Sequence, residues 1–295
     1  MPSESDLSSL RAEIDRIDDA ILDLLIERLA VVARIAAAKG DRAEGRLALR
    51  PAREAAILRR LLARAAGRFP AATLVRMWRE LLAATVAQQT PLTLAVWAPP
   101  GRERVWDLAR DQFGASTPAV RCEDPRRLLQ AVAAGAAAIA VLPSPLPGED
   151  WWLELLEPAA ANLAPIARLP FVAGAGPEAL AFAALEPEPS GEDRALLVLE
   201  PAAPGEEAAL VAALAEAALS PRRLACATHR GRHLELVEIA GFRPRGDGFL
   251  AAAPPAVRRR LRAATVLGAY PRPLEPAPPR CAAADPPLDR APSKR

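Results

Sequence analysis

Lysine is almost missing from this chain, because 36 of its 38 basic residues are arginines and only Lys39 and Lys294 are lysines. Cysteine is scarce too. Cys122, Cys226 and Cys281 are odd in number and far apart, which argues against a disulfide framework or a zinc-finger spacing and suits a reducing compartment. The formal net charge is only +2, so the sequence does not favour a dedicated nucleic-acid-binding protein.

Long apolar runs are also missing. The longest, AVAAGAAAIAVLP, is too short and too rich in alanine to span a bilayer. The N-terminus, MPSESDLSSL, lacks the basic segment and the apolar segment of a signal peptide. With 295 residues and 51% apolar content the chain can form two or three domains with buried cores. We therefore expect a cytoplasmic protein with no membrane and no nucleic-acid partner.

The first 91 residues follow a helical pattern. A helix of near 35 residues is predicted up to Gly40, and its apolar stripe comprises Leu7, Leu10, Ile14, Ile17, Ile21, Leu24, Leu25 and Ala36. Pro51 opens a second helix, and residues 70–89 form a third. Because three helices of such unequal length do not close a core by themselves, we expect a homodimer in which the long helices pair.

Two cations lie on the apolar stripe of the long helix. At about 100° per residue, Lys39 lies within roughly 40° of Arg28, together with Val32 and Ile35. A chain that otherwise uses arginine but keeps Lys39 there suggests a need for a compact ammonium. Buried cations need partners, or they mark an anion site.

Polar residues on the other two helices also face inward. Glu54 shares a helix face with Leu58 and has Arg53 beside it, whereas Thr85 and Gln89 are one turn apart. Two interpretations follow from the residues alone: an ion-pair network that fixes helix register, or a pocket for a small, multiply charged anion in which Glu54 accepts from a hydroxyl.

Two further regions follow. Residues 92–190 alternate strands and helices, which predicts an α/β unit with parallel strands. Residues 191–274 follow the order βαββαβ of a ferredoxin-like sandwich. Residues 275–295 are rich in proline, alanine and arginine, and we expect a disordered tail. The predicted fold class is thus a multidomain α and α/β protein, with a helical domain over 1–91.

Residues 1–91 resemble an all-helical chorismate mutase domain. The resemblance lies in LRAEIDRIDDAILDLLIERLAVVARIAAAKG, RPAREAAILRRL and MWRELLAATVAQQ, where charged or polar residues match across three helices. It implies that the substrate is chorismate, a dicarboxylate with a ring hydroxyl and an enol-ether bridge, and that the product is prephenate. Arg50 departs from the pattern, because the family often has an acid there.

The resemblance also implies roles for the inward-facing residues. Arg28 would bind one carboxylate, and Arg11 from the other protomer would bind the second. Lys39 and Gln89 would donate to the ether oxygen, and Glu54 would accept from the ring hydroxyl. The remaining two, which would support the carboxylate sites, are Arg53 and Thr85.

The implied rearrangement is unimolecular and needs no cofactor, metal or nucleophile, only restraint of the substrate and stabilisation of developing charge. Cys226, His229 and His233 are near one another in sequence, but Gly231 and the strand pattern around it favour surface placement, so we expect no metal.

The rest of the chain resembles a shortened, degenerate prephenate dehydratase followed by an ACT-like regulatory domain, as in bifunctional enzymes. PLTLAVWAPPGRER, AAIAVLPSPLPG and VLGAYPRPL carry the resemblance. Arg102 and Glu103 stand where the family has Thr-Phe, Ser144 and Pro145 where it has Glu-Asn, and no Thr-Arg-Phe occurs between 165 and 195. We therefore expect a chorismate mutase without dehydratase activity. The alternatives are a bifunctional mutase and dehydratase, or a non-catalytic metabolite-binding regulator.

Overall fold

The computed structural model describes residues 4–39, 47–174, 176 and 178–275. It begins with the three expected helices, α1 (Glu4–Lys39), α2 (Pro51–Ala65) and α3 (Ala71–Ala87). Pro51 is the first residue of α2, where its missing N–H costs nothing. The tail predicted over 275–295 lies outside the described residues except for its first residue. The domain limits drawn from sequence stay predictions.

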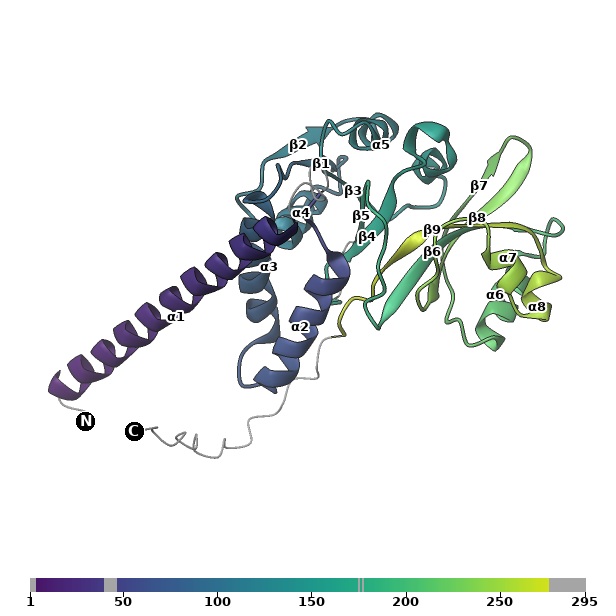
Figure 1. Cartoon of the computed structure of the whole chain (residues 1–295). Coiled ribbons are helices and arrows are strands. Elements are labelled where there is room, and N and C mark those ends of the chain that lie inside the picture. Colours follow the sequence, from purple (N-terminus) through teal and green to yellow (C-terminus); the bar gives the residue numbers. More distant parts are fainter. Residues whose placement is uncertain (1–3, 40–46, 175, 177, 276–295) are drawn as a thin grey trace.

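Helix α1 projects away from the rest of the molecule (Figure 1). Its 36 residues span about 54 Å at 1.5 Å per residue. Large apolar side chains along it are 42–64% exposed: Leu7, Leu10, Ile14, Ile17, Ile21, Leu22, Leu24, Ile26, Val31 and Ile35. Within a single chain, this helix therefore leaves its apolar stripe uncovered. None of the helices in the described residues is both long and apolar enough to cross a membrane.

The α/β region contains a five-stranded mixed sheet in the order β2-β1-β3-β5-β4. Its elements are β1 (Leu94–Trp97), α4 (Arg104–Phe113), β2 (Ala119–Cys122), α5 (Pro125–Ala133), β3 (Ile139–Pro143), β4 (Ala164–Leu169) and β5 (Ala179–Ala183). Strands β1, β2 and β3 are parallel as predicted, but β5 is antiparallel to both β3 and β4, so a wholly parallel unit is wrong. Between β3 and β4 the chain forms two short 3-10 helices, η2 (Trp151–Leu156) and η3 (Pro158–Ala160).

The last region is a four-stranded antiparallel sheet in the order β7-β8-β6-β9. Its elements are β6 (Asp193–Pro201), α6 (Glu207–Glu216), β7 (Arg222–His229), β8 (Arg232–Ala240), α7 (Phe249–Ala252), α8 (Pro255–Arg258) and β9 (Leu261–Pro271). The predicted βαββαβ order is confirmed, except that two four-residue helices replace the second long helix. The middle of β6, residues 195–199, is a continuous apolar run because both faces of the strand are covered.

The two sheets share one core. Trp152 and Phe182 from the α/β region pack in the same buried cluster as Leu196, Leu236 and Tyr270 from the four-stranded sheet. The opposite face of the four-stranded sheet is covered by α6, α7 and α8, and the opposite face of the five-stranded sheet by α4. The α/β and ferredoxin-like regions are therefore packed together along a common apolar layer.

Helices α2 and α3 attach to this body through polar contacts. The Arg59 guanidinium of α2 donates to Ser190 and to the backbone oxygens of Glu192 and Arg272. Glu80 of α3 accepts from the Ala115 N–H at 2.9 and 3.1 Å. The helix pair is thus held against the sheets, whereas α1 is not.

Gly114 ends α4 at a close approach to α3. Its φ is +94°, and a Cβ placed there would lie 2.6 Å from the Cβ of Ala83. A residue that carries a Cβ is strained at such a φ. The contact with Ala83 also leaves no room for a methyl group at this position.

We predict that Gly114→Ala lowers the free energy of unfolding by about 1–3 kcal/mol, because backbone strain and overlap with Ala83 add. Gly135→Ala is the matched control, since its φ is +81° and a methyl group added there would have no atom within 4 Å. Urea-induced unfolding of both variants measures the difference. Equal losses would show that the contact with α3 does not matter.

Candidate functional site

Three of the residues predicted to bind chorismate meet where α1 crosses α3. The Nη1 of Arg28 donates to Thr85 Oγ1 at 3.0 Å, and this hydroxyl donates to the Leu81 backbone oxygen at 2.7 Å. The amide nitrogen of Gln89 donates to the Thr85 backbone oxygen at 3.1 Å. We call Arg28, Thr85 and Gln89 the α1–α3 cluster.

The charge of Arg28 is not neutralised within the described part of the chain. Arg28 is half-buried, and its hydrogen-bond partner there, Thr85, is an uncharged hydroxyl. A guanidinium has five N–H donors in a planar fork, and carboxylates bind such a fork through two parallel hydrogen bonds. The α1–α3 cluster therefore has the donors that a carboxylate ligand needs.

Glu54 does not join this cluster. It faces inward as predicted, but its Oε2 accepts from Arg79 Nη1 of α3 at 2.8 Å. The two side chains are 9% and 4% exposed. Burial raises the pKa of the Glu54 carboxyl, and the adjacent Arg79 guanidinium offsets part of that rise. Between Glu54 and the α1–α3 cluster, the described residues show no hydrogen bond or ion pair.

Arg79, the partner of Glu54, is not among the residues predicted from the sequence. Its guanidinium carbon lies 4.6 Å from the centroid of the Phe171 ring, and Gln112 of α4 accepts from both of its terminal nitrogens at 3.2 and 3.0 Å when the amide oxygen faces it. The signal was present, because Arg79 shares a helix face with the buried residues Val75, Leu82 and Val86.

The other predicted binding residues are more dispersed. Arg53 is exposed on α2, and Arg11 is exposed on α1. Lys39 is the last residue of α1, and its side chain lies outside the described part of the molecule. Arg50, the departure from the family pattern, forms an ion pair with Glu188 at 2.7 Å.

Arg11 and Arg28 cannot bind one small ligand within a single chain. They are 17 residues apart on a continuous helix, which is about 25 Å along its axis. A site that uses both must therefore combine two copies of the chain.

Arg102 occupies the edge of the five-stranded sheet where open α/β folds bind ligands, outside the carboxyl ends of the parallel strands. Its guanidinium pairs with Glu149, donates to the Ser144 backbone oxygen at 3.1 Å and lies 5.4 Å from the Trp97 ring centroid. The loops after β1 and β3 are thus tied to each other.

Comparison with known proteins supports the interpretation of the helices. Residues 10–90 match the family model described as chorismate mutase type II. The N-terminal region carries a chorismate mutase type II domain. The match covers all of the predicted binding residues, from Arg11 to Gln89.

Three similar proteins are named bifunctional chorismate mutase/prephenate dehydratase. The protein from Stutzerimonas stutzeri is 36% identical over 103 residues, 34% of this chain and 28% of the relative. The protein from Pseudomonas aeruginosa is 30% identical over 149 residues, which are 48% of this chain and 40% of the relative. The protein from Neisseria gonorrhoeae is 38% identical over 91 residues, which are 31% of this chain and 24% of the relative. The chain thus spans between 24% and 40% of the length of these relatives.

Solved structures show weaker likeness. A prephenate dehydratase from Arthrobacter aurescens in complex with L-Phe aligns with a TM-score of 0.43 at 15% identity, covering 61% of this chain and 90% of that one. A structure titled GqqA, a novel type of quorum quenching acylases, aligns with a TM-score of 0.44 at 21% identity, covering 61% and 94%. At these values no activity is assigned from the likeness.

We predict that Arg79→Leu destabilises the protein by about 3–5 kcal/mol, because it leaves the Glu54 carboxylate buried without its partner. The double variant Arg79→Leu, Glu54→Leu should recover most of this loss, since it removes both charges. As a control, Arg50→Leu breaks a half-exposed pair and should cost less than about 1 kcal/mol. Urea unfolding measures all three, and a double variant as unstable as the single one would contradict the prediction.

Proposed function

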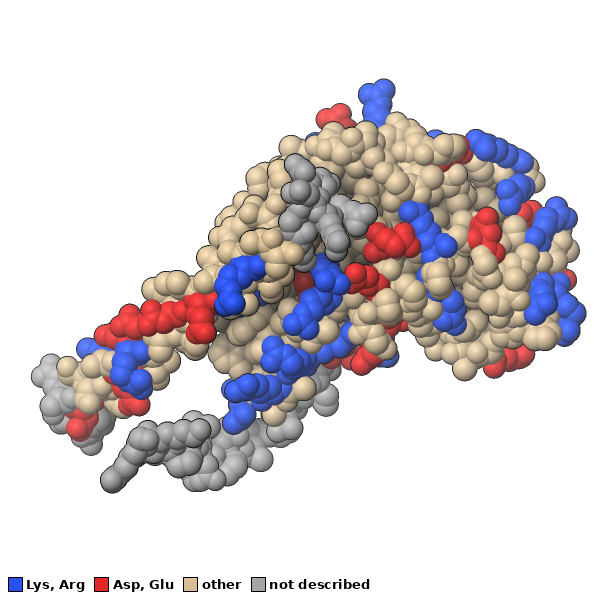
Figure 2. All heavy atoms as spheres, viewed as in Figure 1, with Lys and Arg blue, Asp and Glu red and all other residues tan. Residues whose placement is uncertain are grey.

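We propose that the N-terminal domain binds chorismate and rearranges it to prephenate. The observation that carries the proposal is the α1–α3 cluster: a cation without a carboxylate partner among the described residues lies beside a hydroxyl and an amide. These are the residues implied by the resemblance, within a domain of this family. Figure 2 shows basic side chains gathered over α2, and the exposed residues of this helix include Arg53, Arg60 and Arg64, which would attract a dianion.

In the proposed mechanism Arg28 holds one carboxylate of chorismate bidentately, with Thr85 fixing the guanidinium. This restrains the substrate in the compact conformer in which the bond that breaks and the bond that forms lie close together. Gln89 and Lys39 donate hydrogen bonds to the ether oxygen, which gains negative charge as its C–O bond breaks. Such donors act mainly on the transition state, so they raise the rate rather than the affinity.

The predicted role of Glu54, accepting a hydrogen bond from the ring hydroxyl of the substrate, stays a prediction. Its buried carboxyl is bound by Arg79 and makes no hydrogen bond or ion pair with the α1–α3 cluster among the described residues. Arg53 supports the carboxylate site from the exposed face of α2.

We further propose that the active form is a homodimer built on α1. Leu10, Ile14, Ile17, Ile21 and Leu24 repeat at alternating steps of four and three residues and are 43–64% exposed. This spacing is that of a coiled-coil seam, in which each helix covers the other. Such an arrangement lets Arg11 of the partner chain supply the second carboxylate site.

We assign no dehydratase activity to the downstream regions. Support comes from Arg102, which ties together the loops where a ligand would bind, and from the absence of the Thr-Arg-Phe motif in the sequence. We propose instead that the α/β region and the ACT-like sheet stabilise or regulate the mutase domain, in the cytoplasm. A non-catalytic regulator that only binds chorismate is the second candidate, because Glu54 is already engaged by Arg79.

We predict that the purified chain consumes chorismate at neutral pH and accumulates prephenate. Lys39→Ala should lower kcat by about 100-fold or more, because one donor to the developing oxyanion is lost. Lys294→Ala is the matched control, since Lys294 is the only other lysine, and it should leave the rate unchanged. Chorismate loss and phenylpyruvate formation are followed by absorbance.

The outcomes separate the candidate functions. Phenylpyruvate in the product would establish the bifunctional enzyme. Chorismate that binds but is not consumed would establish the non-catalytic regulator. A Lys39→Ala variant as fast as the unaltered chain would remove Lys39 from the mechanism.

We predict that Ile17→Glu converts the dimer to a monomer in analytical ultracentrifugation, because a charge in the seam cannot be buried against a second helix. Arg16→Glu is the matched control. It introduces the same side chain about 100° away from Ile17, outside the stripe, and should leave the dimer intact.

The crossing of Arg11 has a separate test. Arg11→Ala and Arg28→Ala should each be inactive alone, and mixing them with subunit exchange should restore about a quarter of the activity, because half of the dimers then hold one intact site. No recovery on mixing would show that Arg28 of one protomer and Arg11 of its partner do not share one site.

A further inference from the structure

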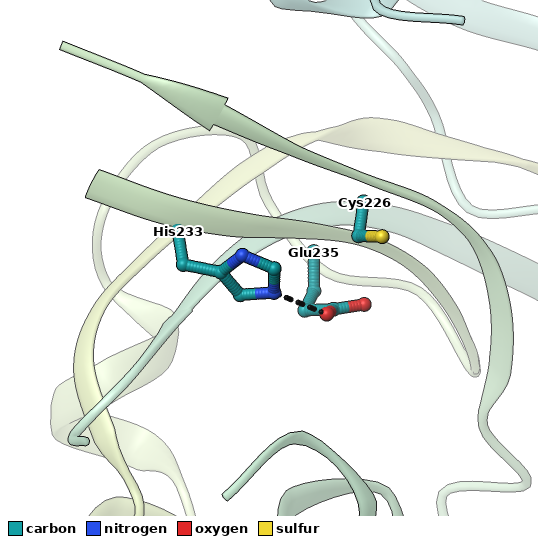
Figure 3. A group of neighbouring side chains, drawn as sticks. All are labelled: Cys226, His233 and Glu235. Carbon is teal, nitrogen blue, oxygen red and sulfur yellow. Dashed lines mark hydrogen bonds and ion pairs between the residues drawn. The ribbon is translucent and has the colours of Figure 1, made fainter. Parts of the chain in front are cut away.

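Three side chains that commonly ligate transition metals gather on one face of the four-stranded sheet. Cys226 of β7 lies directly across from Glu235 of β8, and His233 lies two residues before Glu235, so the pleat directs all three side chains to the same face. Figure 3 shows them converging. The Sγ of Cys226, an imidazole nitrogen of His233 and a carboxylate oxygen of Glu235 all lie within 4.8 Å of one another.

A fourth candidate ligand atom, a second carboxylate oxygen, approaches from α6. The Oε1 of Glu207, in the first turn of this helix, lies 3.5 Å from His233 Nε2. The Gly205 N–H donates to the same oxygen at 3.2 Å. Sulfur, nitrogen and two carboxylate oxygens together match the ligand types and the ligand number of a zinc site.

The position of Glu235 is unusual for a carboxylate. It is 1% exposed, and it shares its strand face with Val237 and Ile239, which pack in the apolar cluster that includes Leu210 and Leu214 of α6. A buried carboxylate needs positive charge nearby. Arg223 supplies one cation, donating to both oxygens, and His233 Nε2 lies 2.9 Å from Oε1.

We propose that Cys226, His233, Glu235 and Glu207 form a binding site for a divalent transition metal of the zinc class. Neutral His233 ligates through Nε2, and Cys226 loses its thiol proton to solvent on binding. Three anionic ligands then face one divalent ion and the Arg223 cation, so the cluster is neutral overall. This departs from the expectation of no metal, which considered His229 rather than the two glutamates.

Arg223 and His229 define the limits of the site. Each carboxylate oxygen has two lone pairs, so Arg223 can hold Glu235 in place as an outer partner while a metal takes the remaining pair. His229 is not part of the site, because its Nε2 lies 3.2 Å from Glu157 of the α/β region.

Cys226, His233 and Glu235 need only small movements to bind an ion, whereas Glu207, whose carboxylate lies next to His233, has to turn farther toward the other two ligands. With Zn–S near 2.3 Å and Zn–N near 2.0 Å, ligand atoms of a tetrahedral site lie roughly 3–4 Å apart. His233 and Glu235 already have such a spacing at 2.9 Å, and Cys226 approaches by a side-chain rotation. The His233 side chain is 36% exposed, which provides a path for the ion from solvent.

The test uses the full chain, with Cys281 replaced by serine so that only two thiols remain. After dialysis against a chelator, the protein is titrated with Co²⁺ and its absorption spectrum recorded. We expect one Co²⁺ per chain, a sulfur-to-cobalt charge-transfer band, the intense visible bands of tetrahedral cobalt, and displacement by one equivalent of Zn²⁺. Zinc should also raise the melting temperature, since it binds only the folded chain.

Matched variants locate the site. Cys226→Ser should abolish the charge-transfer band, whereas Cys122→Ser, which alters the half-buried cysteine of the other sheet, should retain it. His233→Gln should weaken Co²⁺ binding by more than about 100-fold, because even outer partners of a metal site contribute about 10–100-fold. Circular dichroism checks that each variant is folded.

Two results would overturn the proposal. One is a folded parent chain that binds no Co²⁺ at micromolar concentration, which would leave Arg223, His233 and Glu235 as an ion-pair network. The other is a charge-transfer band that persists in Cys226→Ser or disappears in Cys122→Ser.

Discussion

The buried ion pair between Arg79 and Glu54 is central to the contacts that hold α2 and α3 against the α/β region, beside those made by Arg59 and Glu80. It joins α2 to α3, and the same guanidinium meets Phe171 and Gln112 of the α/β region. Removing charges from water is costly, and the cost is repaid only when every donor and acceptor is matched. Because several elements supply the matching groups, their positions are mutually constrained.

This contact also orients α3 for its second role. With Arg79 turned toward the sheets, the helix presents Thr85 and Gln89 to α1, where they meet Arg28. One face of α3 is thus structural, and another carries the candidate site. The separation explains how a chain can contain several inward-facing charges without neutralising all of them: one set is paired for stability, and one cation is left for a ligand.

The exposed stripe of α1 and the cluster of Cys226, His233 and Glu235 show the two ways in which this chain departs from a simple apolar pattern. On α1 the apolar residues are placed regularly, yet nothing within the described part of the chain covers them. On β8 the alternation continues, but His233 and Glu235 take positions where apolar residues would be expected. The exposed apolar stripe of α1 needs a second protein surface to cover it. The buried carboxylate of Glu235 needs cations to balance its charge.

The amino-acid pattern alone determined the three helices, the βαββαβ order and the inward phase of Glu54, because helical and strand periodicity are local properties. The family resemblance also included Arg28, Thr85 and Gln89 among the seven residues predicted to bind or act on the substrate. Only the tertiary structure decided that Glu54 pairs with Arg79 and that Cys226 lies across from Glu235. It also decided that β5 pairs antiparallel with β3 and β4, which makes the five-stranded sheet a mixed one. These depend on contacts between residues far apart in sequence, which periodicity does not encode.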